Sequence, residues 1–111
     1  KHLVDEDVLK ALGKSGTLIN VSRGSVVDEK ALIESLQTGT LGAAGLDVFE
    51  AEPFIPDELK NMPNVVLTPH IGSATTQTRQ AMGDLTCDNL LYYFKSGKVF
   101  TPVPECSNLN V

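Results

Sequence analysis

Three short, predominantly apolar segments constrain the fold of this chain most strongly. They lie at residues 17–21, 41–49 and 65–67. The first and third are typical of strands buried on both faces of a sheet, and the second is a strand of small apolar residues that can pack closely. Between the first two, Asp28 is placed to cap a helix over residues 29–38. A strand, a helix and a second strand at this spacing form a βαβ unit, which takes a right-handed crossover and a parallel sheet. The sequence therefore predicts an α/β fold.

The other segments indicate further helices and a loop. Asp5 is a candidate N-cap for a short helix, and Gly13 stands where a glycine commonly ends one. Prolines interrupt residues 54–63, where we expect a loop with a helical turn at 56–60. A longer helix is expected over residues 75–95. The apolar positions predicted to form its buried stripe are Cys87, Leu90, Leu91 and Phe94.

Composition excludes several classes of function. The chain has 111 residues, enough for one domain, and carries a net charge of −5, which argues against nucleic acid or an anionic membrane as partner. No apolar run approaches the roughly 20 residues needed to span a bilayer, and no signal-peptide pattern is present. The two cysteines, Cys87 and Cys106, have no metal-binding or redox spacing, and the two histidines do not make a metal site. We therefore expect a cytoplasmic protein without a bound metal.

Chemically active side chains follow each predicted strand. Arg23 comes after the first strand, Asp47 ends the second with Glu52 beyond it, and His70 follows the third. In a parallel sheet these strand ends share one edge, where ligands of α/β proteins bind. A guanidinium can hold a carboxylate, an imidazole can exchange a proton, and a carboxylate can orient the imidazole. The set suggests chemistry on a small oxo- or hydroxy-acid, although His70 could merely bond a loop and Arg23 could be a surface charge.

Three sequence blocks closely resemble consecutive blocks of the D-isomer-specific 2-hydroxyacid dehydrogenases. They are LINVSRGSVVDEKAL, GAAGLDVFEAEP and NVVLTPHIGSATTQTR, and the resemblance extends over roughly residues 1–103. It implies an enzyme that uses NAD(P)H to reduce a 2-oxo acid to the D-2-hydroxy acid. It also implies a fold: the carboxyl-terminal half of a Rossmann-type NAD(P)-binding domain, followed by a long C-terminal helix.

The resemblance also implies roles for individual residues. The arginine of the matching S-R-G turn binds the substrate carboxylate and carbonyl in that family, which points to Arg23 as a catalytic and substrate-binding residue. The glutamate before the proline pairs with the catalytic histidine, which points to Glu52 and His70. Asp47 matches an aspartate that contacts the nicotinamide end of the cofactor. The other expected cofactor-binding positions are Val21, Ser22 and Gly72, with Arg23 and His70 beside them.

The block HIGSATTQTRQAM most resembles the glyoxylate/hydroxypyruvate reductase branch of the family. Phosphoglycerate dehydrogenases tend to have a second glycine where this chain has Ser73, and formate dehydrogenases have glutamine in place of Glu52. We therefore expect glyoxylate or hydroxypyruvate as the substrate and NAD(P)H as the cofactor. NADPH is favoured over NADH, but the positions that read the ribose are not among these residues. A homodimer is expected from the family.

The chain departs from the family in what it does not contain. It has no G-x-G-x-x-G sequence, and it matches neither the pyrophosphate-binding half of the domain nor most of the substrate domain. We expect residues 1–98 to be a partial NAD(P)-binding domain and residues 99–111 to be an extended tail that leads to the substrate domain. Such a piece should by itself be catalytically inert and marginally stable. Two alternatives are a dinucleotide-sensing, corepressor-like interaction protein and an inactive truncated relative.

Overall fold

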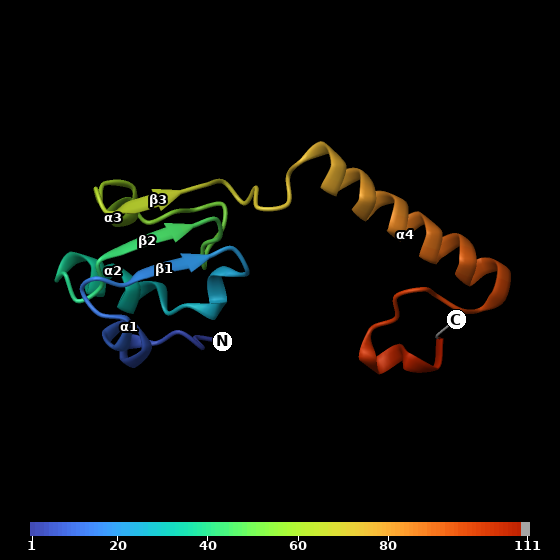
Figure 1. The fold of residues 1–111 in the computed structure, drawn as a ribbon, viewed down its shortest axis with the longest axis horizontal. Coiled ribbons are helices and arrows are strands. Elements are labelled where there is room, and N and C mark those ends of the chain that lie inside the picture. Colours follow the sequence, from blue (N-terminus) through green and yellow to red (C-terminus); the bar gives the residue numbers. More distant parts are fainter. Residues whose placement is uncertain (110–111) are drawn as a thin grey trace. The chain divides into compact units, whose positions relative to one another are not determined.

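The computed structural model describes residues 1–109, which form two compact units (Figure 1). The first unit is Lys1–Gly72 and the second begins at Ser73. The domain boundary predicted after residue 98 stays a prediction, because the compact units of this chain do not define the domains of a longer protein.

The first unit is built on a parallel sheet. Its strands are β1 (Thr17–Asn20), β2 (Ala43–Leu46) and β3 (Val65–Leu67), in the order β1-β2-β3. Both neighbouring pairs are parallel, so all three strands end at the same edge of the sheet. The predicted α/β fold with a parallel sheet is thereby confirmed.

The predicted helix caps explain where the helices of this unit begin. Asp5 accepts the amide hydrogen of Val8 at the start of α1 (Glu6–Leu12), and Asp28 accepts that of Ala31 at the start of α2 (Glu29–Gln37). Two shorter elements are the 3₁₀ turn η1 (Gly24–Val26) and the helical turn α3 (Asp57–Lys60).

The two longer helices cover one face of the sheet. α1 and α2 pack against each other and contribute side chains to the same buried cluster as β2 (Figure 1). Because burial of apolar area is the main stabilising term in folding, this cluster holds the strand ends in place. Its buried members are Leu9, Val27, Leu32, Leu36, Leu41, Ala44, Leu46, Phe49 and Leu59.

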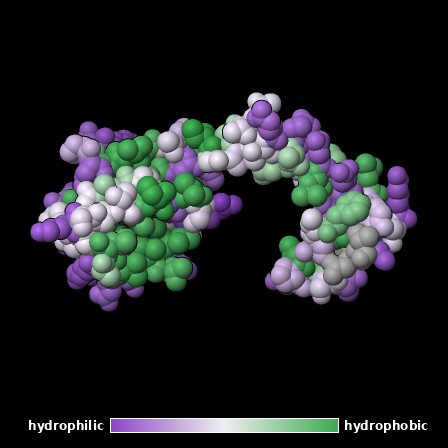
Figure 2. Space-filling model, viewed as in Figure 1, coloured by the Kyte–Doolittle hydropathy of each residue, from purple (hydrophilic) through white to green (hydrophobic). Residues whose placement is uncertain are grey.

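The opposite face of the sheet is uncovered within this unit. Ile19 and Val66, which flank Gly45 across the sheet, are 63% and 68% exposed. Figure 2, in the same view as Figure 1, shows hydrophobic residues gathered on the surface of this unit. The prediction that β1 and β3 are buried on both faces is therefore wrong for this unit. Parallel sheets are normally covered on both faces, so this surface lacks the second layer typical of such folds.

The second unit contains one long helix and the tail. α4 (Thr76–Ser96) begins after the N-cap Thr75 and ends at Gly97, which adopts a left-handed conformation. The predicted helix is confirmed, but the predicted burial of Cys87 is wrong: it is exposed, and within residues 1–109 no residue of α4 is buried. No helix in the described part of the chain is long and apolar enough to cross a membrane.

The tail folds back onto α4 through one amide side chain. Asn89 accepts hydrogen bonds from the amides of Phe100 and Thr101 and donates one to the Thr101 hydroxyl. Residues Pro104–Leu109 form 3₁₀ turns interrupted at Cys106. The prediction of an extended tail is therefore wrong for this segment, where a proline begins a turn because its fixed φ suits one. Residues 110–111 of the predicted tail lie outside the described residues.

Candidate functional site

His70 stands three residues beyond β3, in a left-handed backbone conformation. Thr68 and Pro69 end the strand, and the φ angle of His70 is +54°. For a residue with a Cβ this conformation costs about 1 to 2 kcal/mol, so the surrounding structure must hold the turn. The turn brings the imidazole to the edge of the sheet where ligands of α/β proteins bind.

The imidazole of His70 is paired with Glu52. Its Nδ1 lies 2.8 Å from Oε2 of Glu52, while the other carboxylate oxygen accepts the amide hydrogen of Phe49 at 3.0 Å. The hydrogen bond from His70, and then that from Phe49, hold the pKa of Glu52 below its usual value. Because an ionised carboxylate can only accept, Nδ1 must carry a proton. Nε2 makes no hydrogen bond within residues 1–109.

An apolar cavity adjoins this pair. It has a volume of about 180 Å³. The imidazole, which is 49% exposed, lines it together with Glu52. The pair therefore lies at the surface of the described unit and is accessible to a small molecule. The other lining residues are Phe49, Pro53, Ile55 and Pro69.

Asp47 lies beneath the loop that carries His70. Its side chain is buried, with the residue 4% exposed. One carboxylate oxygen accepts the hydroxyl of Thr68 at 2.5 Å and the amide of Ile71 at 2.9 Å. The other accepts the amide of Gly72 at 2.8 Å. Both carboxylate oxygens of Asp47 therefore accept hydrogen bonds within the chain. Contact of Asp47 with a nicotinamide stays a prediction.

The pKa of Asp47 predicts how acid changes stability. The hydroxyl of Thr68, followed by the amides of Ile71 and Gly72, lowers the pKa of Asp47 below its ordinary 3.8. The ionised carboxylate of Asp47 therefore contributes fully to the free energy of unfolding above pH 3.8, its pKa in the unfolded chain. That contribution is lost as the pH falls through the lower pKa of Asp47 in the folded protein. We expect Asp47→Asn to be less stable than the unsubstituted protein at neutral pH, with a gap that shrinks in acid. Urea unfolding at a series of pH values measures the gap, and a constant gap would contradict the assignment.

Arg23 is carried by a turn that Asn20 shapes. Asn20 is 5% exposed and donates from Nδ2 to the carbonyl of Arg23 at 3.1 Å. Its Oδ1 accepts both the amide and the hydroxyl of Ser22 at 3.1 Å. The guanidinium is exposed and donates to the carbonyl of Ser22 at 2.6 Å, a contact with its own turn. A substrate carboxylate would replace this neutral acceptor with a charged one, which makes a stronger hydrogen bond.

Gly24 sets the distance between the Arg23 turn and the loop that leads to Glu52. A Cβ added at Gly24 would lie 2.0 Å from the carbonyl carbon of Phe49, so only glycine fits against this backbone. We expect Gly24→Ala to lower the free energy of unfolding by about 1 to 3 kcal/mol. Urea unfolding tests this, with Gly83→Ala as control because a Cβ there meets nothing within 4 Å. Equal stability of the two variants would show that the close approach is not present in solution.

The structure brings most of the predicted site residues together. Glu52 bonds His70 directly, and Gly72 bonds the carboxylate of Asp47. Val21 also adjoins Gly72, since its Cβ is 4.0 Å from where a Cβ of Gly72 would be. Ser22 lies in the Arg23 turn, and the charge of Arg23 is near enough to contribute, as the smallest of the causes, to the lowered pKa of Glu52.

Sequence reasoning missed three residues that organise the site: Asn20, Gly24 and Thr68. A signal existed for Asn20, because asparagine at the end of a strand commonly bonds the backbone two residues on. The roles of Gly24 and Thr68 depend on segments more than 20 positions away, since Thr68 and Asp47 are 21 positions apart. No local pattern reports such contacts.

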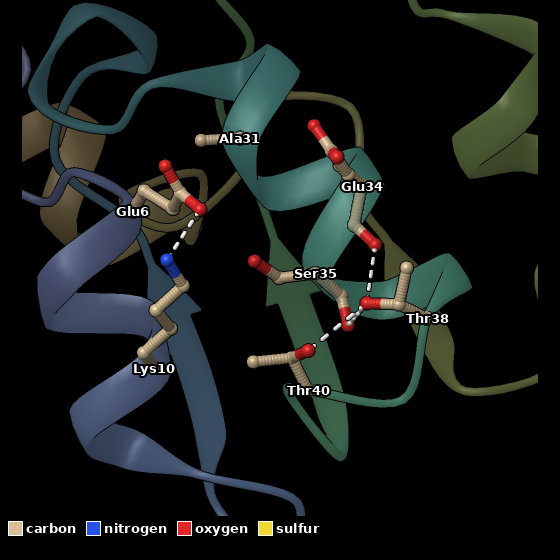
Figure 3. Close-up of a pocket in the computed structure, with 7 residues that line it drawn as sticks. All are labelled: Glu6, Lys10, Ala31, Glu34, Ser35, Thr38 and Thr40. Atoms are coloured by element: carbon tan, nitrogen blue, oxygen red, sulfur yellow. Dashed lines mark hydrogen bonds and ion pairs between the residues drawn. The ribbon is translucent and has the colours of Figure 1, made fainter.

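A second cavity lies between α1 and α2, near the amino end of β2 and therefore away from His70 (Figure 3). Its polar groups largely satisfy one another: Lys10 pairs with Glu6, and the hydroxyls of Thr38 and Thr40 share a hydrogen bond. It offers no free cluster of like charge to attract an ion. In the part of the chain that the structure describes, no group of three His, Cys, Asp or Glu residues could hold a metal ion.

Comparison with known proteins supports the resemblance to the 2-hydroxyacid dehydrogenases. Residues 1–72 match the family model described as "D-isomer specific 2-hydroxyacid dehydrogenase, NAD binding domain". The chain is 52% identical to glyoxylate/hydroxypyruvate reductase A of Arabidopsis thaliana over 103 residues, which cover 93% of this chain and 33% of that protein. It is 49% identical to hydroxyphenylpyruvate reductase of Plectranthus scutellarioides over 102 residues, or 92% of this chain and 33% of that protein.

A solved structure agrees in fold. NADPH-dependent glyoxylate/hydroxypyruvate reductase of Sinorhizobium meliloti, in complex with NADP and malonate, matches with a TM-score of 0.90 and 57% identity. The match covers 92% of this chain and 32% of that one. The chain thus spans about a third of the length of the relatives it matches.

Proposed function

The chain belongs to the D-isomer-specific 2-hydroxyacid dehydrogenase family, and from this premise we propose that it is part of an oxidoreductase that reduces a small 2-oxo acid with NAD(P)H. The observation that carries the proposal is the pair of Glu52 and His70 at the edge of the sheet, with the exposed Arg23 on a neighbouring turn. The three groups supply a proton donor, its orienting carboxylate and an anion-binding fork.

The chemistry follows from these groups. Arg23 turns from its own backbone to the substrate carboxylate, and its fork orients the neighbouring carbonyl. His70 donates the proton on Nε2 to the carbonyl oxygen, and Glu52 stabilises the charged form of the imidazole before transfer. NAD(P)H, when bound, supplies the hydride that reaches the carbonyl carbon. One hydride and one proton together convert the 2-oxo acid to the 2-hydroxy acid.

The residues present fit the nicotinamide end of such a cofactor. Val21, the residue that follows β1, is 66% exposed. It lies beside Gly72, which has no side chain to obstruct a flat ring. We propose that these positions, with Ser22, Asp47 and the Arg23 turn, line the nicotinamide side of the cleft. The chain has no glycine-rich pyrophosphate motif, so the other end of the cofactor would bind elsewhere in the protein.

The finer assignments belong to the same proposal. Glyoxylate or hydroxypyruvate is the proposed substrate, supported by the names of the Arabidopsis and Sinorhizobium relatives. NADPH is the proposed cofactor, supported by the NADPH-dependence stated for the Sinorhizobium enzyme. We also propose that the protein forms a homodimer and is located in the cytoplasm.

The test is turnover by a full-length protein that contains these residues. Oxidation of NADPH and of NADH is followed with glyoxylate and with hydroxypyruvate, and the configuration of the product is determined on a chiral column. We expect turnover and the D isomer where the product is chiral. An interaction protein of the same fold, or an inactive relative, would bind cofactor without turnover, and that result would overturn the proposal.

The 111 residues alone should show no turnover in the same assay. Hydride transfer requires both reactants to be held in register, and these residues would provide one side of the cleft only. The uncovered apolar face of the sheet, with Ile19 63% exposed, is also expected to make the piece marginally stable. Turnover by the isolated piece would show that the cleft is complete without the rest of the protein.

A further inference from the structure

We propose that Thr68 and Asp47 form a clasp that fixes the position of His70, so that both are positioning residues for proton transfer. The effect of the clasp on proton transfer rests on the proposed function, whereas the hydrogen bonds of the clasp do not depend on it. The clasp consists of the hydroxyl of Thr68, the carboxylate of Asp47, and the amides of Ile71 and Gly72 that the carboxylate holds.

Packing holds the side chain of His70 only in part. It is 49% exposed, and Glu52, 35% exposed, is its hydrogen-bond partner among residues 1–109. The backbone of His70 meanwhile has a φ of +54°, which a residue with a Cβ rarely adopts. Its amide donates to the carbonyl of Thr68 at 3.1 Å, a bond within the turn itself. Contacts outside the turn must therefore keep the imidazole in position beside Glu52.

The clasp provides those contacts and ties them to the sheet. Leu46 and Leu67 are partners in the register of β2 and β3, so Asp47 and Thr68 are the next residues after these two strands. The amide of Thr68 donates to the carbonyl of Leu46 at 2.9 Å, which continues the pairing. The hydroxyl of Thr68 donates to Oδ1 of Asp47 at 2.5 Å. This side-chain hydrogen bond joins the two segments one residue beyond the last pair in the strand register.

Asp47 is suited to hold the loop because it is buried and charged. At 4% exposure its carboxylate has little access to water, so its hydrogen bonds must come from the protein. Three donors reach it, two of them backbone amides on the far side of His70. A Cβ at Gly72 would lie 3.1 Å from Oδ2 of Asp47, so glycine lets the loop close on the carboxylate. The lowered pKa of Asp47 agrees with a charge that these donors stabilise.

Thr68 allows a test that leaves the carboxylate in place. Thr68→Val removes the hydroxyl while keeping the shape of the side chain, and Thr68→Ser keeps the hydroxyl. A small displacement of a catalytic group can cost roughly 100-fold in rate. In the full-length protein we therefore expect Thr68→Val to lower kcat by about tenfold to 100-fold, with the KM for the reduced cofactor unchanged within about twofold. Thr68→Ser should restore most of kcat.

Amide hydrogen exchange gives a second readout that does not depend on activity. Release of the clasp should speed exchange in a peptide that contains Ile71 and Gly72 by about tenfold or more in Thr68→Val, but not in Thr68→Ser. Thr38→Val serves as the matched control, because the Thr38 hydroxyl bonds within the α2 region. It should change neither exchange at residues 71–72 nor kcat.

The outcomes separate this inference from the proposed function. If the unsubstituted protein shows no turnover, the proposed function fails, while exchange at Ile71 and Gly72 still decides whether the clasp exists. Unchanged exchange in Thr68→Val would overturn the clasp. Unchanged kcat with a raised cofactor KM would overturn the positioning role and assign Asp47 to cofactor contact alone. Faster exchange together with a lower kcat would support both parts.

Discussion

Replacement of His70 by alanine should lower kcat by about 10²- to 10⁴-fold, the usual contribution of general acid catalysis. The imidazole is placed for this role because Glu52 accepts from Nδ1 at 2.8 Å and leaves Nε2 for the substrate oxygen. Alanine removes the proton donor and leaves the loop backbone in place, since Asp47 bonds the amides of Ile71 and Gly72 and not the ring of His70. The loss should therefore fall on kcat more than on binding.

Steady-state kinetics of the full-length protein measure this effect, together with cofactor affinity from fluorescence titration. His2→Ala is the matched control, because His2 also bonds a carboxylate, at 2.9 Å from Glu50, but comes before the first helix. It should leave kcat unchanged. Turnover of His70→Ala within a few fold of the unsubstituted protein would remove His70 from the proton path.

Arg23→Lys should lower kcat/KM for a 2-oxo acid by roughly tenfold to 150-fold. The guanidinium can bind a carboxylate through two parallel hydrogen bonds, while an ammonium presents a single point charge. A hydrogen bond to a charged group contributes about 1.5 to 3 kcal/mol, which corresponds to that range. The turn itself should survive, because Asn20 bonds the backbone carbonyl of Arg23 and not its side chain.

A substrate pair isolates the carboxylate contact. Glyoxylate and glyoxal differ in that glyoxal has no carboxylate, so Arg23→Lys should reduce kcat/KM for glyoxylate far more than for glyoxal. The preference of the enzyme for the acid should shrink accordingly. An equal loss on both substrates would mean that Arg23 acts on the carbonyl or on the fold, and an unchanged kcat/KM would exclude contact with the acid.

The parallel sheet and the long helix could be predicted from the sequence because they depend on local or topological rules, while the Glu52–His70 pair could be predicted because its residues resemble a family motif. Asp5 and Asp28 both cap the helices that they precede, since capping involves residues three positions apart. The strands are parallel because the crossover of a βαβ unit returns the chain to the end of the sheet where the first strand began, and parallel strands end at one edge. Family resemblance then supplied the pairing of Glu52 with His70, which the structure shows as a hydrogen bond.

Burial and long-range hydrogen bonds were decided by the tertiary structure alone. An apolar pattern predicts which face of an element is hydrophobic but not whether another element covers it, so the exposure of Ile19, Val66 and Cys87 could not be predicted. The partners of Asp47 lie 21 to 25 positions along the chain, and the sequence does not specify which amides a buried carboxylate will meet. Only the folded backbone brings Thr68 and Gly72 to the same carboxylate, because a hydrogen bond requires approach to about 3 Å.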